Sequence, residues 1–238
     1  MIVVDSISKR IKDKIIYSGI SLSCAASCSY LLVGTNGVGK TSLLKTITGL
    51  YKYDSGLVSV CGRQVGKNFI VPENIGVFFD TARMLPHNVV KKSLLFYASL
   101  YGKNLSDVEA LIKVLHLEDE IEKKFINLST GNKRKVALLI SLINNPDLLI
   151  WDEPFASLDP EMCSELVELI KSLRAQGKTF LISTNDLYYG EEIYDKIGFF
   201  LNSKTIVEKS KQDLAEQYPG KSLHDIYFLI KSEAEAKQ

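Results

Sequence analysis

The chain has 238 residues, with 29 Lys and Arg against 28 Asp and Glu, and a formal net charge of +1. A charge this close to zero excludes proteins that bind nucleic acid or anionic lipid through bulk charge. Hydrophobic residues make up 46% and charged residues 24%, which excludes disorder over the whole chain. The length allows one large domain or two small ones.

Three further features concern compartment and membrane. Asp5 interrupts the apolar N-terminal stretch and no small-residue cleavage site follows it, so we expect no signal peptide. The longest apolar runs have about 8 residues, whereas a membrane span needs roughly 20, so we expect no direct membrane insertion. The cysteines at 24, 28, 61 and 163 lack metal-binding or redox spacing, and we expect reduced thiols in a cytosolic protein.

The first third of the chain predicts the start of an α/β fold. Short runs rich in β-branched and aromatic residues indicate strands. They cover 2–7, 14–24, 29–34, 57–62 and 74–79. A glycine loop after the third of them leads into a helix over 41–50, where Leu43, Leu44, Ile47 and Leu50 share one face.

The periodicity then becomes helical and later returns to alternating α and β segments. The predicted helices cover 88–102, 105–117, 130–143 and 160–176, and the predicted strands cover 147–151 and 179–184. A hairpin is predicted from 196–202 and 205–210, and a helical tail from 211–238.

The glycine loop carries the strongest motif. Residues 34–41 read Gly-Thr-Asn-Gly-Val-Gly-Lys-Thr and match G-x-x-x-x-G-K-[ST] between a predicted strand and a predicted helix. Glycines let successive backbone N–H groups point at a phosphate, and the helix N-terminus adds positive potential. We expect Lys40 to reach the β- and γ-phosphates and the Thr41 hydroxyl to ligate Mg²⁺. The predicted nucleotide-binding residues are Thr35, Asn36, Gly37, Val38, Gly39, Lys40, Thr41 and Ser42.

Two adjacent acids follow the predicted strand at 147–151. Beyond a strand end each carboxylate can be aimed separately, so we assign Asp152 to Mg²⁺ and Glu153 to the general base that polarises the attacking water. Alone, such a pair most often begins a solvated loop. Combined with the upstream phosphate loop, it indicates a nucleotide-hydrolysing site.

Together these motifs resemble the ATP-binding subunits of ABC transporters, over roughly residues 1–230. The segment Leu128-Ser129-Thr130-Gly131-Asn132 is similar to the family signature Leu-Ser-Gly-Gly-Gln. The resemblance implies that Ser129 and Gly131 donate to the γ-phosphate of an ATP held by the opposite subunit of a homo- or heterodimer. Read alone, the segment is an ordinary helix N-cap. Ser157-Leu158-Asp159 resembles the family's D-loop.

Three positions depart from the family pattern. Asp80 replaces a glutamine that senses Mg²⁺, and its carboxylate can ligate the ion directly. Asn185 replaces the switch histidine, and its amide can hydrogen-bond a γ-phosphate but cannot carry a proton. Ile11 replaces the aromatic residue that stacks on adenine, and Tyr17 is misaligned for that role. The resemblance therefore implies MgATP binding and hydrolysis, with a turnover that these departures reduce or regulate.

The resemblance implies an α/β fold of the P-loop NTPase type, with a RecA-like core, a small antiparallel β subdomain and an inserted helical subdomain. We expect a single ABC ATPase domain over 1–230, with the core at about 1–84 and 144–210 and a helical lobe at about 85–143. Residues 211–238 form the predicted C-terminal helical tail.

The resemblance also implies a partner. The helical lobe would dock on a multi-span membrane permease subunit, which places the protein in the cytoplasm, peripheral to the cell membrane. We expect most apolar side chains of 81–101 in the core, and Met84 and Leu85 as candidates for permease contact. The run Lys133-Arg134-Lys135 could screen ATP phosphates or form a solvated face, and we expect the solvated face. The compact size is more similar to exporter-type systems.

Two alternatives keep the fold and change the role. One is a soluble ABC-type ATPase of translation, repair or cofactor assembly, which the single ATPase domain and the lack of a long coiled coil disfavour. The other is a catalytically weak regulatory subunit, motivated by Asp80 and Asn185. The favoured interpretation is the ATP-hydrolysing, energy-coupling subunit of a transporter.

Overall fold

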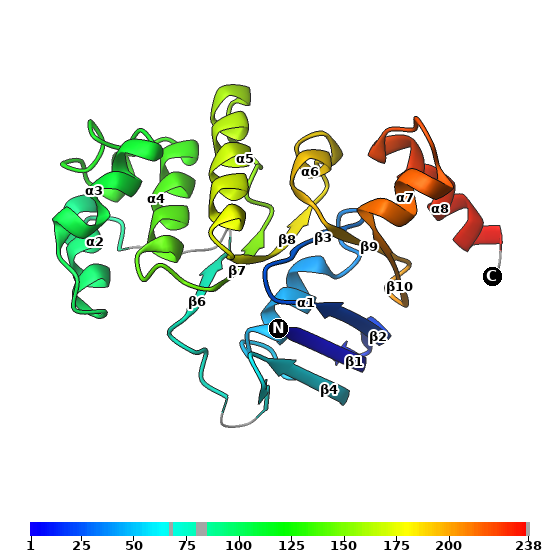
Figure 1. Ribbon diagram of the computed structural model, residues 1–238. Coiled ribbons are helices and arrows are strands. Elements are labelled where there is room, and N and C mark those ends of the chain that lie inside the picture. The colour runs from blue at the N-terminus through cyan, green and yellow to red at the C-terminus, as the bar shows by residue number, and fades with distance from the viewer. Residues whose placement is uncertain (67–68, 80–84, 237–238) are drawn as a thin grey trace.

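The computed structural model describes residues 1–66, 69–79 and 85–236. Within them, two sheets lie on either side of one helix, α1 (Figure 1). The larger sheet has the order β10-β9-β3-β8-β7-β6. Its strands are β3 (Ser29–Val33), β6 (Ile75–Phe78), β7 (Leu148–Asp152), β8 (Thr179–Thr184), β9 (Lys196–Leu201) and β10 (Thr205–Ser210). The smaller sheet, β2-β1-β4-β5, contains β1 (Ile2–Ile11), β2 (Lys14–Cys24), β4 (Ser55–Val60) and β5 (Arg63–Gln64).

The described helices lie mostly on the face of the larger sheet opposite α1 (Figure 1). They are α1 (Lys40–Ile47), α2 (Val90–Ser99), α3 (Leu105–Val114), α4 (Thr130–Leu142), α5 (Pro160–Ala175), α6 (Leu187–Ile193), α7 (Lys211–Gln217) and α8 (Leu223–Ala236), with a short 3₁₀ turn at Phe125–Asn127. In chain order, α2, α3 and α4 lie between β6 and β7. In space, α2 and α3 lie beyond the β6 edge of the sheet, and α7 and α8 lie near its β10 end.

The larger sheet is parallel from β6 to β9, and only the β9–β10 pair is antiparallel. Every residue of β3, β7 and β8 is buried, as expected for parallel strands whose two faces are both covered. Alternate side chains of these strands enter two different cores. Leu32 and Ile150 pack with α1 and the smaller sheet, whereas Leu31 and Trp151 pack under the helices of the other face.

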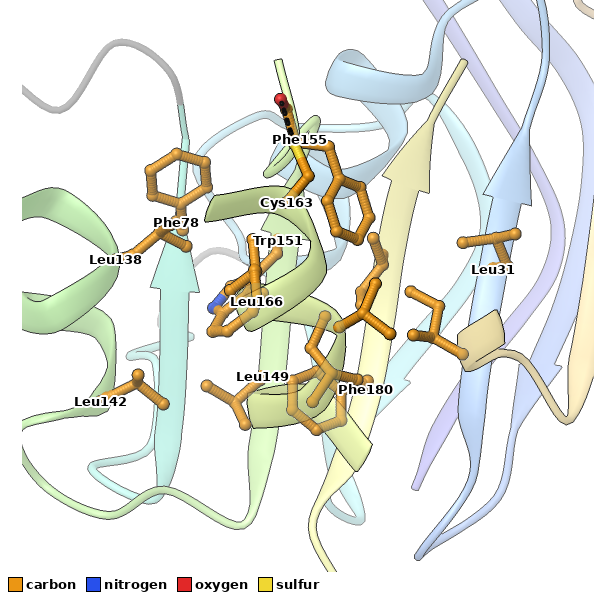
Figure 2. Close-up of a cluster of buried hydrophobic side chains, with 14 of the residues drawn as sticks. Leu31, Phe78, Leu138, Leu142, Leu149, Trp151, Phe155, Cys163, Leu166 and Phe180 are labelled. Carbon is orange, nitrogen blue, oxygen red and sulfur yellow. Dashed lines mark hydrogen bonds between the residues drawn. The ribbon is translucent and has the colours of Figure 1, made fainter. Parts of the chain in front are cut away.

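The second of these cores extends without a break into the helical segment (Figure 2). Trp151 packs edge-to-face on Phe180 at 5.3 Å between ring centroids, and its indole N–H donates to the Ser141 hydroxyl on α4 at 3.1 Å. Leu138 and Leu142 of α4 lie beside it, and the same cluster includes side chains of α2 and α3. The inserted helices therefore share the core of the sheet.

The structure contains the strands and helices that the sequence predicted, with boundaries that shift by a few residues. The predicted helical tail consists of two helices, α7 and α8, and Leu50 lies beyond the end of α1 and is 62% exposed, so its predicted place on the inner helix face is wrong. The structure adds β5 and α6, which the sequence pattern did not predict. Gly190 lies inside that short helix, and glycine is a poor helix former. A Cβ atom there would lie 2.9 Å from the side chain of Leu31 on β3, so close packing favours glycine at this position.

The segment before and along α2 differs in part from expectation. Tyr97 packs against the core, but Phe96 is 59% exposed, Leu100 is 60% exposed and Tyr101 is 39% exposed. The expectation that most of these side chains are internal is therefore wrong for these three residues. Leu85 is exposed, as expected of a contact residue, whereas Met84 lies outside the described residues. Within the described part of the chain, no helix has the length and apolar character to span a membrane.

Candidate functional site

The glycine loop joins the end of β3 to α1 and lies directly against the sheet. Gly39 is the N-cap of α1 with a φ of 119°, which residues with a side chain rarely adopt. A Cβ atom on Gly34 would lie 2.7 Å from the carbonyl oxygen of Phe200 on β9. Glycine at these two positions therefore lets the backbone itself form the wall of a phosphate site.

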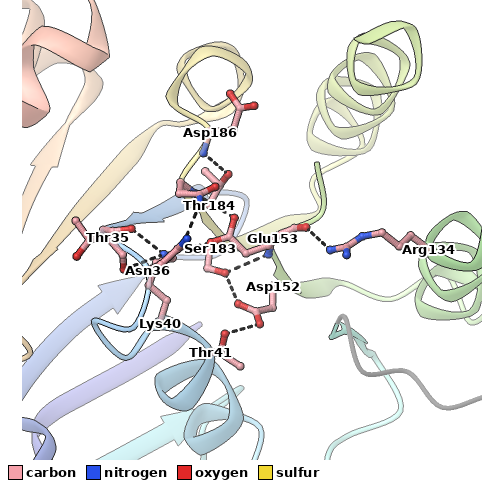
Figure 3. A network of polar contacts seen from close by, with 12 residues as sticks. Thr35, Asn36, Lys40, Thr41, Arg134, Asp152, Glu153, Ser183, Thr184 and Asp186 are labelled. Carbon is pink, nitrogen blue, oxygen red and sulfur yellow. Dashed lines mark hydrogen bonds and ion pairs between the residues drawn. The ribbon is translucent and has the colours of Figure 1, made fainter. Parts of the chain in front are cut away.

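Lys40 begins α1, and its ammonium group turns back over the loop (Figure 3). Its Nζ donates to the carbonyl oxygen of Gly34 at 2.7 Å and lies 3.2 Å from Oε1 of Glu153. The side chain of Lys40 is only 6% exposed and that of Glu153 is 21% exposed. Since the pair is largely shielded from water, its attraction is stronger than that of a surface pair. The same ammonium is the group predicted to bind a phosphate.

Thr41 and Asp152 meet across the site, although 111 positions separate them in the chain. The Thr41 hydroxyl donates to Oδ2 of Asp152 at 2.7 Å, and the Ser183 hydroxyl donates to Oδ1 of the same carboxylate. A hydroxyl and a carboxylate side by side are hard oxygen donors of the kind that Mg²⁺ prefers, with room for phosphate oxygens and water. These residues fit the predicted ion. The third predicted ligand, Asp80, lies outside the described residues.

Asn185 follows β8 and contacts both the loop and the second acid. Its side-chain amide donates to Oδ1 of Asn36 at 3.1 Å. Its backbone N–H donates to Oε2 of Glu153, also at 3.1 Å. Asn185 is therefore at the position expected from the sequence, where it joins the phosphate loop to the acid at the end of β7.

Glu153 has an unusual backbone. Its φ of 51° lies in the left-handed region, which costs a residue other than glycine about 1–3 kcal/mol when the surroundings enforce it. Its N–H donates to the carbonyl oxygen of Ser183 at 3.0 Å. Its own carbonyl oxygen accepts from Nη2 of Arg134 on α4 at 2.9 Å. Hydrogen bonds on both sides thus hold the residue in this conformation.

Two adjoining hollows lie over these groups. One has a volume of about 260 Å³ and a wall of Lys14, Ile15 and Ile16 beside the loop. The other has a volume of about 420 Å³, and Asp152 and Glu153 are among its lining residues. Asn36, Thr41 and Glu153 line both hollows, so the phosphate loop, the acids and the wall with Ile15 and Ile16 form one connected site.

The apolar side chains beside the loop bear on the expectation that Ile11 takes the place of the aromatic residue on adenine. Ile15 and Ile16 line the hollow, and Ile11, which is 46% exposed, is not among its described lining residues. Tyr17 is fully buried and bonds to Thr46 at 2.6 Å, and its burial raises the pKa of Tyr17 to about 12. The Tyr17 ring therefore cannot stack on an adenine base, as its sequence position suggested.

The signature segment lies apart from these hollows. Ser129 caps α4 and accepts from the N–H of Asn132 at 3.1 Å, and neither Ser129 nor Gly131 is among the described lining residues. A Cβ atom on Gly131 would lie 3.4 Å from the carbonyl oxygen of Ser157, so the predicted D-loop packs against the signature segment. Asp159 caps α5, and the N–H of Met162 holds the pKa of its carboxyl below the ordinary value. Within one subunit, Ser129 and Gly131 therefore do not line the same hollow as the phosphate loop.

Sequence reasoning missed three residues of the site. Arg134 was expected on a solvated face, which is wrong because only 7% of it is exposed and it contacts Glu153. The sequence did contain a signal for its burial, because Arg134 precedes Leu138 by four positions and therefore lies on the same, buried face of α4. Ser183 had the signal of a hydroxyl at the end of an apolar strand. Ser203, whose hydroxyl donates to the carbonyl oxygen of Val38 at 2.8 Å, had no signal.

We expect Ser203→Ala to weaken ATP binding about two- to tenfold, because the phosphate loop loses a hydrogen bond worth about 0.5–1.5 kcal/mol. The dissociation constant of a fluorescent ATP analogue measures this. Lys204→Ala, in the same turn, serves as the control and should bind as the wild type does. Equal affinities of Ser203→Ala and the wild type would show that the turn does not support the loop.

Comparisons with known proteins agree with this geometry. The family model described as ABC transporter matches residues 17–156. The Nod factor export ATP-binding protein I of Burkholderia lata is 33% identical over 227 residues, which cover 93% of this chain and 75% of that protein. The protein of the same name from Rhizobium etli is 30% identical over 226 residues, with coverages of 93% and 72%.

Solved structures share the fold. An ATP-binding subunit of an ABC transporter superposes with a TM-score of 0.85 at 24% identity, covering 96% of this chain and 98% of that one. A dimeric ATP-binding cassette bound to ADP and Pi gives a TM-score of 0.77 at 21% identity, with coverages of 88% and 98%. With the family match over the phosphate loop, the signature segment and the acids, this chain belongs to the ABC transporter family as an ATP-binding subunit.

Proposed function

We propose that this subunit hydrolyses ATP with Glu153 as the general base, and that Lys40 and the backbone of residues 35–42 bind the phosphates. The observation that carries the proposal is the ion pair of Lys40 with Glu153 inside the phosphate site. The γ-phosphate and the carboxylate compete for one ammonium group. When ATP takes Lys40, the Glu153 carboxylate becomes free to accept a proton from water.

The neighbouring oxygens support a role for Mg²⁺. Thr41 and Asp152 would hold the ion, with Asp80 as a third candidate ligand, and the ion would neutralise charge on the phosphates. Ser183 fixes one oxygen of Asp152, which leaves the other directed at Thr41. In the cycle, the protein's own task is to hold this carboxylate in place and to keep Glu153 next to the attacking water.

We further propose that turnover is slow compared with a subunit that has an imidazole at the switch position. Asn185 donates to Asn36 of the loop and can reach a γ-phosphate, but its amide cannot act as an acid or a base as an imidazole can. The backbone N–H of Asn185 still supports Glu153, so we expect reduced and not abolished hydrolysis.

The proposed working unit is a dimer of ATP-binding subunits on a membrane permease. The separation of Ser129 and Gly131 from the phosphate loop supports a site that a second subunit completes. Exposed apolar side chains suit permease docking, with Leu85 near Ile126 and Phe96 near Leu100. The relatives are named for export, which favours an exporter on the cytoplasmic face of the cell membrane.

We expect Glu153→Gln to lower phosphate release by about 10²- to 10⁴-fold, because the amide cannot accept the proton of water. ATP binding should be retained or tightened, since the uncharged side chain no longer competes for Lys40. Colorimetric phosphate release and binding of a fluorescent ATP analogue measure the two effects. Equal hydrolysis rates of the two proteins would remove the assignment of Glu153.

We expect Asn185→His to raise kcat by about tenfold, a gain smaller than the 10²–10⁴-fold of a general base. The gain should depend on pH around 6–7, where a histidine changes its charge. A pH series of phosphate release on the wild type, Asn185→His and Asn185→Ala measures it. A histidine variant no faster than the wild type at any pH would contradict the proposed slowing.

We expect Phe96→Glu to reduce co-purification with a co-expressed multi-span permease by about tenfold, because a buried charge at an interface centre costs more than 1 kcal/mol. ATP hydrolysis by the isolated subunit should not change. Leu229→Glu on α8 is the control, since Leu229 is also partly exposed but lies far along the chain from α2. Equal recovery with both variants would place the docking surface elsewhere.

A further inference from the structure

Arg134 is a buried charged residue on the helix that begins with the signature segment. It follows the cap residue Ser129 by five positions and is 7% exposed. Its neighbours Lys133 and Lys135 are more exposed. Arg134 shares its helix face with Leu138, which lies in the core beside Trp151. Figure 3 shows Arg134 reaching from α4 toward the end of β7.

The guanidinium group joins three elements. Its Nη2 donates to the carbonyl oxygen of Glu153, just past β7, at 2.9 Å. Its central carbon lies 5.8 Å from the ring centroid of Phe78, the last residue of β6. A charged donor makes a stronger hydrogen bond than a neutral one, and shielding from water strengthens it further. Arg134 therefore fixes α4 to the strand end that presents the acid.

The hydrogen bond from Arg134 restrains the backbone conformation of Glu153, which sets the direction of its carboxylate. Glu153 has a φ of 51°, and its N–H is held by Ser183 while its carboxylate is held by Lys40 and the N–H of Asn185. When ATP takes Lys40, one of these restraints on the carboxylate is lost. The backbone bonds then determine the direction of the side chain, and Arg134 supplies the bond on the carbonyl side.

A second contact makes α4 and β7 one unit. The Ser141 hydroxyl accepts from the indole N–H of Trp151, two residues before Glu153, at 3.1 Å. Arg134 and Ser141 lie seven positions apart, which is two helical turns, so both point to the same side of α4. A displacement of α4 at its signature end would therefore change the position of Glu153.

We propose that Arg134 is a positioning residue for ATP hydrolysis: it holds the backbone of Glu153 and transmits movement of the signature helix to that acid. The inference rests on the proposed role of Glu153 as the base. It links, within one subunit, the signature segment that would meet the partner's ATP and the acid that acts on the subunit's own ATP.

The test compares Arg134→Ala, Arg134→Lys and the wild type in steady-state phosphate release. For Arg134→Ala we expect kcat to fall about tenfold to a hundredfold, the effect of misplacing a catalytic group by about 1 Å, with KM for ATP changed less than about threefold. Guanidinium ion at low, non-denaturing concentration should restore part of kcat in Arg134→Ala, because it fits the space left by the side chain. Arg134→Lys should lie between the two. Lys135→Ala, which changes the adjacent charge, should have the wild-type kcat.

The outcomes separate this inference from the proposed function. A wild-type kcat for Arg134→Ala, or a loss of kcat together with raised KM, lowered melting temperature and no guanidinium rescue, overturns the positioning role. Glu153→Gln is measured in parallel. If it equals the wild type, the role of Glu153 is wrong and this inference falls with it. If Glu153→Gln is inactive and only Arg134→Ala behaves as the wild type, the inference alone is wrong.

Discussion

The parallel pairing of β3, β7 and β8 is the constraint on which the site depends. Because parallel strands end at the same edge of a sheet, the phosphate loop after β3, the acids after β7 and Asn185 after β8 must meet there. The strand register determines which side chains lie together, since Asp152 of β7 pairs with Ser183 of β8. The hydroxyl of Ser183 then fixes the carboxylate that faces Thr41. Burial of both faces of these strands keeps that edge rigid.

At this edge, Lys40 is both the ion-pair partner of Glu153 and the group proposed to bind the phosphates of ATP. A buried ammonium without a charged partner is costly, and the Glu153 carboxylate is the charged partner of Lys40 beside the carbonyl oxygen of Gly34. A phosphate with more negative charge is the better partner. In the proposed mechanism, ATP binding and release of the Glu153 carboxylate are therefore one exchange at the Lys40 ammonium group, and Glu153 accepts a proton from water only after ATP has bound.

The sequence predicted what is encoded locally. The loop at 34–41 and the acids Asp152 and Glu153 each lie within a short motif, and strand periodicity placed both at strand ends. Residues that act through the tertiary fold were not predictable in this way. Arg134 and Ser203 reach the site from α4 and the β9–β10 turn, far along the chain. The helix phase that Arg134 shares with Leu138 indicates that Arg134 is buried, but nothing in either neighbourhood marks which group the side chain contacts. Helix α6 was missed because close packing on β3 selects Gly190, against local helix propensity.

At the switch position, the backbone and the side chain of Asn185 make different contacts. Glu153 accepts from the main-chain N–H of Asn185, a donor that every residue except proline supplies, so the support of the acid does not depend on the histidine usual in the family. The side chain instead bonds Asn36 in the phosphate loop. In the proposed mechanism, the substitution therefore changes the contact with the γ-phosphate and leaves the hydrogen bond that supports Glu153. The same proposal makes the rate depend on how firmly backbone contacts such as that of Arg134 hold Glu153 in place.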